Sequence, residues 1–252
     1  MKVITVLNQK GGIGKTTTAH TIGAGLKSRG FRVLFADLDR QGNLTYSTGA
    51  AAGGLNAFDL LTGAADAGDA ITHAPGGDII KASPDLAAAD ILITGRRKEY
   101  RLKDALQEVA GDYDFCVIDT PTTLGIITMN ALTAADGAII PTQAAIFDLQ
   151  GIALLRDTVN AVKRSSNPGL TVYGILITGF DGRTVLGRDM REAMEAAAGA
   201  LSTRVFATPV RRCNAIPEAQ TRQQDIFSYK RRSNAAQDYN AVIDELLQII
   251  GG

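Results

Sequence analysis

Residues 10–17 read Lys10-Gly11-Gly12-Ile13-Gly14-Lys15-Thr16-Thr17, shortly after the apolar run Val3–Leu7. Glycines at this spacing allow the backbone to curl so that its N–H groups point inward at phosphate oxygens, and a following helix adds its positive N-terminal dipole. In such a loop the lysine reaches the β- and γ-phosphates and the next hydroxyl ligates Mg²⁺. The order of strand, turn and helix therefore predicts a phosphate-binding loop with Lys15 and Thr16 as its chemical groups.

Short apolar runs and longer amphipathic stretches alternate along the 252 residues, which is typical of an α/β protein. Several runs are apolar at nearly every position, as strands covered by helices on both faces must be. We therefore expect a doubly wound, mostly parallel sheet flanked by helices, the P-loop NTPase fold, in a single domain spanning residues 1–252. The expected strands are Val3–Leu7, Arg32–Ala36, Asp78–Lys81, Phe115–Ile118, Gly137–Pro141, Val172–Ile177 and Arg204–Ala207. The expected helices are Thr16–Ser28, Arg101–Ala110, Gly125–Ala134, Leu149–Lys163, Gly187–Ala200 and Ala235–Ile250, with a surface excursion at Gly49–Ala70.

Charge and composition exclude several classes of protein. Lys+Arg and Asp+Glu both number 26, so the net charge is zero and any site for a polyanion must be local. The two cysteines, Cys116 and Cys213, lack the CxxC spacing that would indicate a metal or redox pair. Nowhere do eighteen apolar residues run together, so we expect no signal peptide, no transmembrane helix and a cytoplasmic location.

Aspartates follow two of the expected strands. Asp37 and Asp39 come after Arg32–Ala36, and Asp119 comes directly after Phe115–Ile118. The carboxyl ends of parallel strands face the ligand crevice, so these acids should lie near the phosphates. Phosphoryl transfer to water needs a group that orients the water, for which Asp39 is the candidate, and Asp119 is the candidate Mg²⁺ ligand. The alternative is that they are ordinary strand-end carboxylates that cap turns.

The glycine-rich loop resembles the deviant phosphate loop, K-G-G-x-G-K-[ST], of the ParA/MinD family of dimerising ATPases. Gln9 stands where the ordinary P-loop motif has glycine. The run Asp37-Leu38-Asp39-Arg40-Gln41-Gly42-Asn43 is similar to the family's D-x-D-P-Q-x-N segment, with Arg40 in place of the proline. The resemblance implies that residues 10–17 bind ATP with Mg²⁺, and that Lys10 crosses a dimer interface to the partner's nucleotide. It also implies that the second aspartate activates the attacking water and that the first lies near the Mg²⁺.

The resemblance covers nearly the whole chain and favours the ParA partition branch. Three further segments carry it, namely Asp181–Thr184, Arg211–Ala219 and Ala235–Tyr239. The segment Thr208-Pro209-Val210 is similar to the family's adenine-side loop, which implies nucleotide contacts at Pro209 and Val210. This branch implies a homodimer with ATP that binds double-stranded DNA non-specifically, associates with the nucleoid and is stimulated by a ParB-like centromere-binding protein.

The expected DNA contacts lie in a basic segment, residues 204–232, which carries seven basic residues against two acidic ones, a net charge of +5. The candidates for DNA contact within it are Arg211, Arg212, Arg222, Lys230, Arg231 and Arg232. A solvated charged face is the competing interpretation. A second basic cluster, Arg96, Arg97, Lys98, Arg101 and Lys103, is explained adequately by its place at the start of an expected helix.

Other functions remain open on the sequence alone. An ATPase of the same family could position a protein cargo on the nucleoid in place of DNA. A MinD-like membrane switch would end in a basic amphipathic helix, whereas no Lys or Arg follows Arg232, so we expect no membrane partner. A metallocluster carrier would need paired cysteines at a dimer face, a setting that neither Cys116 nor Cys213 has.

Overall fold

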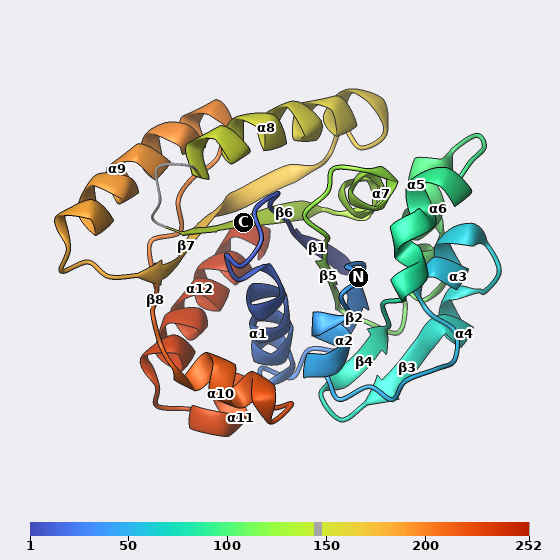
Figure 1. Cartoon of the computed structure of the whole chain (residues 1–252), viewed down its shortest axis with the longest axis horizontal. Helices are drawn as coiled ribbons and strands as arrows, with labels where there is room; N and C mark the ends of the chain where they lie inside the picture. The colour runs from blue at the N-terminus through green and yellow to red at the C-terminus, as the bar shows by residue number, and fades with distance from the viewer. Residues whose placement is uncertain (144–147, 252) are drawn as a thin grey trace.

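The computed structural model describes residues 1–143 and 148–251, and these form a sheet that is covered by helices on both faces (Figure 1). The strands are β1 (Lys2–Val6), β2 (Val33–Asp37), β3 (Ile71–Ala74), β4 (Gly77–Ile80), β5 (Phe115–Asp119), β6 (Gly137–Gln143), β7 (Thr171–Phe180) and β8 (Val210–Arg211). Their order is β3-β4-β2-β5-β1-β6-β7-β8, and among these strands only the pair β3 and β4 is antiparallel. The doubly wound, mostly parallel α/β sheet expected from the sequence is confirmed.

The helices divide between the two faces of the sheet. One face is covered by α1 (Lys15–Lys27), α2 (Asn43–Ser47) and α12 (Asn234–Gly251), beside which lie α10 (Ala215–Thr221) and α11 (Ile226–Lys230). The other carries α3 (Ala57–Thr62), α4 (Ala67–Ala70), α5 (Ala89–Leu92), α6 (Arg101–Glu108), α7 (Ile126–Ala134), α8 (Asp148–Ser165) and α9 (Val185–Ala200), with short 3-10 helices at Pro84–Ala88 and Lys98–Tyr100. None of the helices within the described residues has the length and apolar character that a bilayer span requires.

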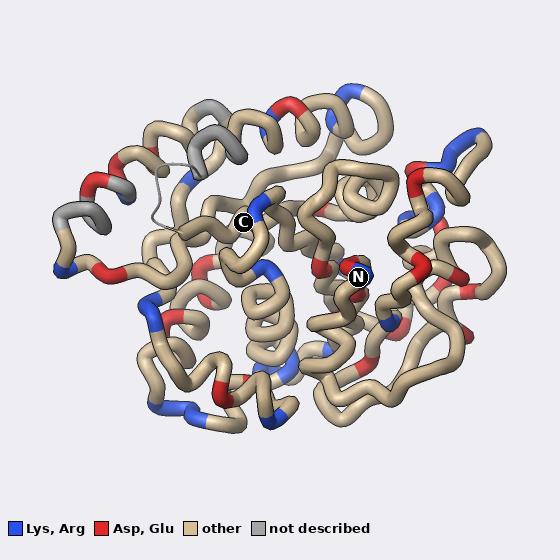
Figure 2. The backbone as a smooth tube through the Cα atoms, viewed as in Figure 1, with Lys and Arg blue, Asp and Glu red and all other residues tan. Residues whose placement is uncertain are grey.

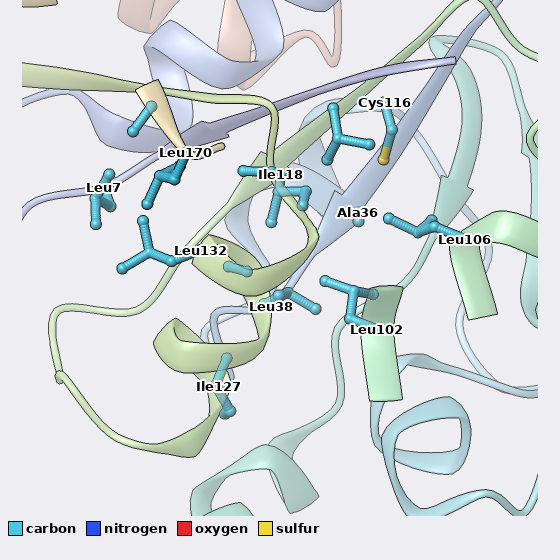
Figure 3. Packing of buried hydrophobic residues seen from close by; sticks show 14 of the residues in the cluster. Leu7, Ala36, Leu38, Leu102, Leu106, Cys116, Ile118, Ile127, Leu132 and Leu170 are labelled. Carbon is cyan, nitrogen blue, oxygen red and sulfur yellow. The ribbon is translucent and has the colours of Figure 1, made fainter. Parts of the chain in front are cut away.

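The core consists of two apolar layers because the strands alternate in the face to which each residue points. In β5, Cys116 and Ile118 pack with α6 and α7 in one layer (Figure 3), whereas Phe115 and Val117 pack in the layer beneath α1 and α12. All four side chains are buried. A strand that is apolar on both faces therefore lies at the centre of the sheet, as its sequence predicted.

Helix α1 lies close against its neighbours through two glycines. A Cβ atom at Gly23 would overlap the ring of Phe35 on β2, and a Cβ atom at Gly25 would overlap the side chain of Ile243 on α12. Overlap this severe is not met by real Cβ atoms, so an alanine at either position requires the helix or the facing side chain to move. The glycines therefore determine how deeply α1 is seated on the sheet.

The expected strand Arg204–Ala207 is wrong in its extent. Only a single bridge forms there, between Val205 and Ile175 of β7, and the edge strand β8 begins five residues later, at Val210. Pro209 lies between the two pairings and has no backbone N–H to donate to a ladder. The antiparallel strand β3 was not predicted from the sequence at all.

The expectation of a surface excursion at Gly49–Ala70 is also wrong for its second half. Helices α3 and α4 form there, and five of their residues are buried, namely Ala57, Leu60, Leu61, Ala67 and Ala70. Asn56 begins α3 with a capping box, in which its side chain accepts from the N–H groups of Phe58 and Asp59. The alanines that suggested a loop are the small residues that pack these short helices beside α6.

The parallel register brings the acidic residues together at the carboxyl edge of the sheet. Asp119, the last residue of β5, lies opposite Val6 of β1 on one side and opposite Asp37 of β2 on the other. The chain leaves β1 into the glycine-rich loop and leaves β2 toward Asp39. The fold therefore places the predicted phosphate loop and the predicted acids at one site.

Candidate nucleotide-binding site

The glycine-rich loop has the backbone conformation that its glycines predict. Gly12 has φ 76° and Gly14 has φ 90°, in the left-handed region that glycine adopts without strain. The loop is anchored from outside, because the Thr178 hydroxyl donates to the Ile13 carbonyl at 2.8 Å. Beneath it, Asn8 accepts from the backbone N–H of Lys10 at 3.2 Å. The backbone is thus held in a defined curve before any ligand arrives.

Lys15 lies inside this curve with its side chain almost completely buried, at 7% exposure. Its ammonium donates to the carbonyl oxygen of Lys10 across the loop at 3.0 Å. Burial lowers the pKa of Lys15, and the charges of Asp119 and Asp39 act in the opposite direction. A buried cation at the base of a loop of backbone donors is suited to bind the oxygens of a phosphate chain.

The hydroxyl of Thr16 donates to Asp119 Oδ2 at 2.6 Å. Asp119 is fully buried, and its other oxygen, Oδ1, has no hydrogen-bond partner among the described residues. Burial, and then the neighbouring charge of Asp37, raises the pKa of Asp119 well above its ordinary value. A hydroxyl and an orphaned carboxylate oxygen are hard donors of the kind that Mg²⁺ prefers, so Thr16 and Asp119 fit a divalent cation beside the phosphates.

Asp37 is engaged in organising the segment that follows β2. One carboxylate oxygen accepts from the backbone N–H and the hydroxyl of Thr45 at 2.7 and 2.8 Å, and the other accepts from the N–H of Asp39 at 3.2 Å. Burial raises the pKa of Asp37 to about 6. These contacts fix the start of α2 relative to β2. A role for Asp37 near the metal stays a prediction.

Asp39 lies half-buried at the cavity, on a turn that forms without the proline of the family motif. Its Oδ1 accepts from the N–H of Gln41 at 3.0 Å, and its carbonyl accepts from the N–H of Gly42 at 2.9 Å. Arg40 therefore stands at the exposed corner of a closed turn. In the family motif, a proline with its fixed φ stands at this corner. Here the two hydrogen bonds that Asp39 accepts hold the turn closed.

Lys15, Thr16 and Asp39 line a cavity of about 860 Å³, a volume in the range that small-molecule sites occupy. Asp37 and Asp119 are not among its described lining residues. The predicted site residues that line it are Gly11, Gly12, Gly14, Lys15, Thr16, Thr17 and Asp39. Ile13 is buried behind the loop, and Lys10 is exposed at its start. Pro209 and Val210 are not among the described lining residues: Val210 is buried in β8, paired with Thr178. Their contact with a nucleotide stays a prediction.

Matches of this sequence to known proteins identify one family. A family profile described as "AAA domain" matches residues 1–172. The sporulation initiation inhibitor protein Soj of Bacillus subtilis is 38% identical over 243 residues, which cover 94% of this chain and 95% of Soj. The chromosome partitioning protein ParA of Caulobacter vibrioides is 35% identical over 256 residues, covering 98% of this chain and 94% of that protein. The chain belongs to the ParA/MinD family of P-loop ATPases.

A solved structure shares the P-loop NTPase fold of this chain. The crystal structure described as cobyrinic acid a,c-diamide synthase from Mycobacterium smegmatis, with bound ADP and magnesium, matches with a TM-score of 0.87 and 33% identity. The match covers 100% of this chain and 96% of that one. That relative therefore binds a nucleotide and magnesium on the same fold.

The sequence analysis missed several cavity residues of this ParA/MinD chain, among them Gln220, Asp90 and Tyr46. Gln220 on α10 donates to the hydroxyl of Thr17 at 3.0 Å, and Asp90 on α5 accepts from the N–H of Ile126 at 2.6 Å. Tyr46 on α2 is exposed at the cavity. Motif spacing carries no signal for them, because each arrives through tertiary packing of a segment distant from the phosphate loop in sequence.

The Lys and Arg positions of the basic segment at residues 204–232 lie on the C-terminal part of the backbone (Figure 2), and two of these side chains have a contact within the chain. Arg211 forms an ion pair with the buried Asp238, with Nη2 to Oδ1 at 2.6 Å, and its backbone N–H donates to the same carboxylate. Arg222 lies over the ring of Tyr229, 5.5 Å from its centroid. The side chains of Arg212, Lys230, Arg231 and Arg232 are exposed. A contact of any of the six predicted residues with DNA stays a prediction, and Arg211 has a structural role of its own.

Proposed function

We propose that this chain is an ATP-dependent switch that pairs with a second copy, binds duplex DNA non-specifically and is released by hydrolysis of ATP. The observation that carries the proposal is the pairing of Thr16 with Asp119 beside the buried ammonium of Lys15, beneath a preformed curve of backbone donors. This set of groups serves a Mg²⁺–nucleoside triphosphate. The relatives named as chromosome partitioning proteins support DNA as the cargo. The proposed partner is a ParB-like centromere-binding protein that marks this DNA.

Each residue at the site has a defined task in this reaction. The N–H groups of residues 11–17 and the ammonium of Lys15 hold the phosphate chain in place. A Mg²⁺ ion held by Thr16 and Asp119 would neutralise charge that develops on the phosphate oxygens. Asp39, at the cavity wall, orients the attacking water in line with the terminal phosphate. The task of Asp37 is to hold the Asp39 turn and α2 in position.

The alanine variant of Lys10 tests the pairing of two chains. Lys10 is exposed at the start of the loop, while its own carbonyl accepts from Lys15. Because the proposed contact of its ammonium is to the partner's nucleotide, Lys10→Ala is expected to keep ATP binding within threefold and to weaken ATP-induced pairing by at least about tenfold, the loss of one charge-assisted contact. Sedimentation velocity with ATP measures this, with the exposed Lys98→Ala as control. An unchanged dimer fraction contradicts the role of Lys10.

The DNA-binding step is tested by salt dependence. With ATP and not with ADP, the chain is expected to bind duplexes of unrelated sequence with similar affinity, since phosphate contacts carry no base information. Each neutralised phosphate contributes about −0.9 to the slope of log K against log salt, so several arginines produce a slope of several units. The triple replacement of Lys230, Arg231 and Arg232 by alanine should lower both affinity and slope and leave pairing intact.

The matched control for this experiment is the triple replacement of Arg96, Arg97 and Lys98 by alanine. It removes the same charge from exposed side chains elsewhere, in the segment just before α6. If both triple variants reduce DNA affinity equally, the effect comes from net charge and not from the basic segment. No affinity of the ATP-loaded parent for long duplex DNA at low salt would overturn the proposed function.

A further inference from the structure

Arg40 is a cavity residue that has no role in the reaction proposed above. It occupies the corner of the turn between Asp39 and Gln41, its side chain is exposed, and it lines the nucleotide cavity. The turn is closed on both sides of it by the bonds from Gln41 N to Asp39 Oδ1 and from Gly42 N to the Asp39 carbonyl. The backbone at Arg40 is therefore fixed, whereas its long side chain remains at the open side of the cavity.

The charges at the cavity wall show what Arg40 contributes. Of the described residues that line the cavity, Lys15 and Arg40 are basic, and Asp39 and Asp90 are acidic. Without Arg40, Lys15 would be the one basic side chain among these lining residues, facing two carboxylates as well as the phosphate chain. Phosphate oxygens in a partly enclosed site need compensating donors, because an uncompensated buried charge is costly.

Two further carboxyl groups lie at the strand ends next to the cavity. Asp119 bonds to Thr16, and Asp37 lies opposite Asp119 in the sheet. A metal ion offsets charge at the side where Thr16 stands. Arg40 stands with Asp39 on the turn after β2, so it supplies positive charge on the side of the water-orienting carboxylate.

We propose that Arg40 binds the terminal phosphate of ATP in the same chain and stabilises the charge that gathers on its oxygens during hydrolysis. This inference rests on the proposed function. A guanidinium presents a planar fork of N–H donors that matches two phosphate oxygens at once, which an ammonium does not. An arginine so placed recognises the state of the nucleotide, since ADP lacks the group that it binds.

The test compares the affinities for ATP and ADP in Arg40→Ala and Arg40→Lys by isothermal titration calorimetry with Mg²⁺. In Arg40→Ala the affinity for ATP is expected to fall by at least about tenfold, the loss of one charge-assisted contact. The affinity for ADP should stay within twofold. Arg40→Lys should recover only part of the loss, because a lysine lacks the fork. Hydrolysis at saturating ATP should fall at least about tenfold in both variants.

Arg164→Ala is the matched control, since it removes an exposed guanidinium from the last turn of α8. Equal losses for ATP and ADP in Arg40→Ala, or no loss for either, would overturn the proposal. So would full recovery by lysine, which would reduce the role to an unspecific positive charge. Failure of the parent chain to bind ATP at all would be a failure of the proposed function itself, and is visible separately in the same titration.

Discussion

Replacement of Lys15 by methionine is expected to lower the affinity for ATP by at least about 100-fold, because two charge-assisted contacts of about 1.5–3 kcal/mol each are lost. Methionine keeps an unbranched apolar stem in the buried position that Lys15 occupies. The ammonium that it removes is the buried cation beneath the glycine-rich loop, held by the Lys10 carbonyl. Calorimetric titration with ATP and Mg²⁺ measures the change.

The control for Lys15→Met is the same substitution at the exposed Lys98, which lies outside the cavity lining among the described residues. Thermal unfolding without nucleotide checks that the fold is retained. Burial lowers the pKa of Lys15, because desolvation disfavours its charged form, so removal of the charge is not expected to unfold the chain. An ATP affinity within threefold of the parent's would exclude Lys15 from the site.

The second large effect is expected from Asp39→Asn, which should reduce ATP hydrolysis by at least about 100-fold, the range for loss of a general acid–base group. Asparagine keeps the side-chain oxygen that accepts from Gln41 N, so the turn around Arg40 should persist. Phosphate and metal contacts do not involve this side chain, and the affinity for ATP should therefore stay within threefold. Steady-state phosphate release gives the rate, and titration gives the affinity.

The expected consequence of Asp39→Asn is a chain trapped in the ATP-bound form, which remains paired and on DNA. Asp69→Asn is the control, since Asp69 is an exposed carboxylate on α4. Hydrolysis at the parent's rate would assign the water to another group, for which the cavity-lining Asp90 would be the next candidate. A parallel loss of ATP affinity would instead mean that Asp39 binds the ground state.

The central sheet could be predicted from the sequence because its strands carry a strong local signal. β1, β2 and β5 are apolar on both faces, and β2 and β5 end at aspartates, so each was found within a residue or two of its observed bounds. The edges carry no such signal. β8 has only two residues, and its pairing with β7 includes a shift in register. β3 is a strand because it pairs with the antiparallel β4, and its own composition does not predict it.

The site was predictable where one continuous segment builds it. The loop at residues 10–17 and the acids at the strand ends follow from spacing, and the structure brings Lys15, Thr16, Asp39 and Asp119 to one edge of the sheet. Gln220 could not be found in this way, because its contact with Thr17 joins residues 203 positions apart. The partner of Arg211 was equally hidden, since Asp238 lies on the helix that follows the basic segment.

The two glycines of α1 bear on the alignment of the site as well as on the core. Gly23 lies seven residues after Thr16, which is two turns along the same rigid helix. A methyl group there would push the helix away from Phe35, and the displacement would pass along the axis to the end that holds Thr16. A hydrogen bond of 2.6 Å to Asp119 does not survive a shift of about 1 Å. The lack of a side chain at Gly23 and Gly25 therefore helps to hold Thr16 within hydrogen-bond distance of Asp119.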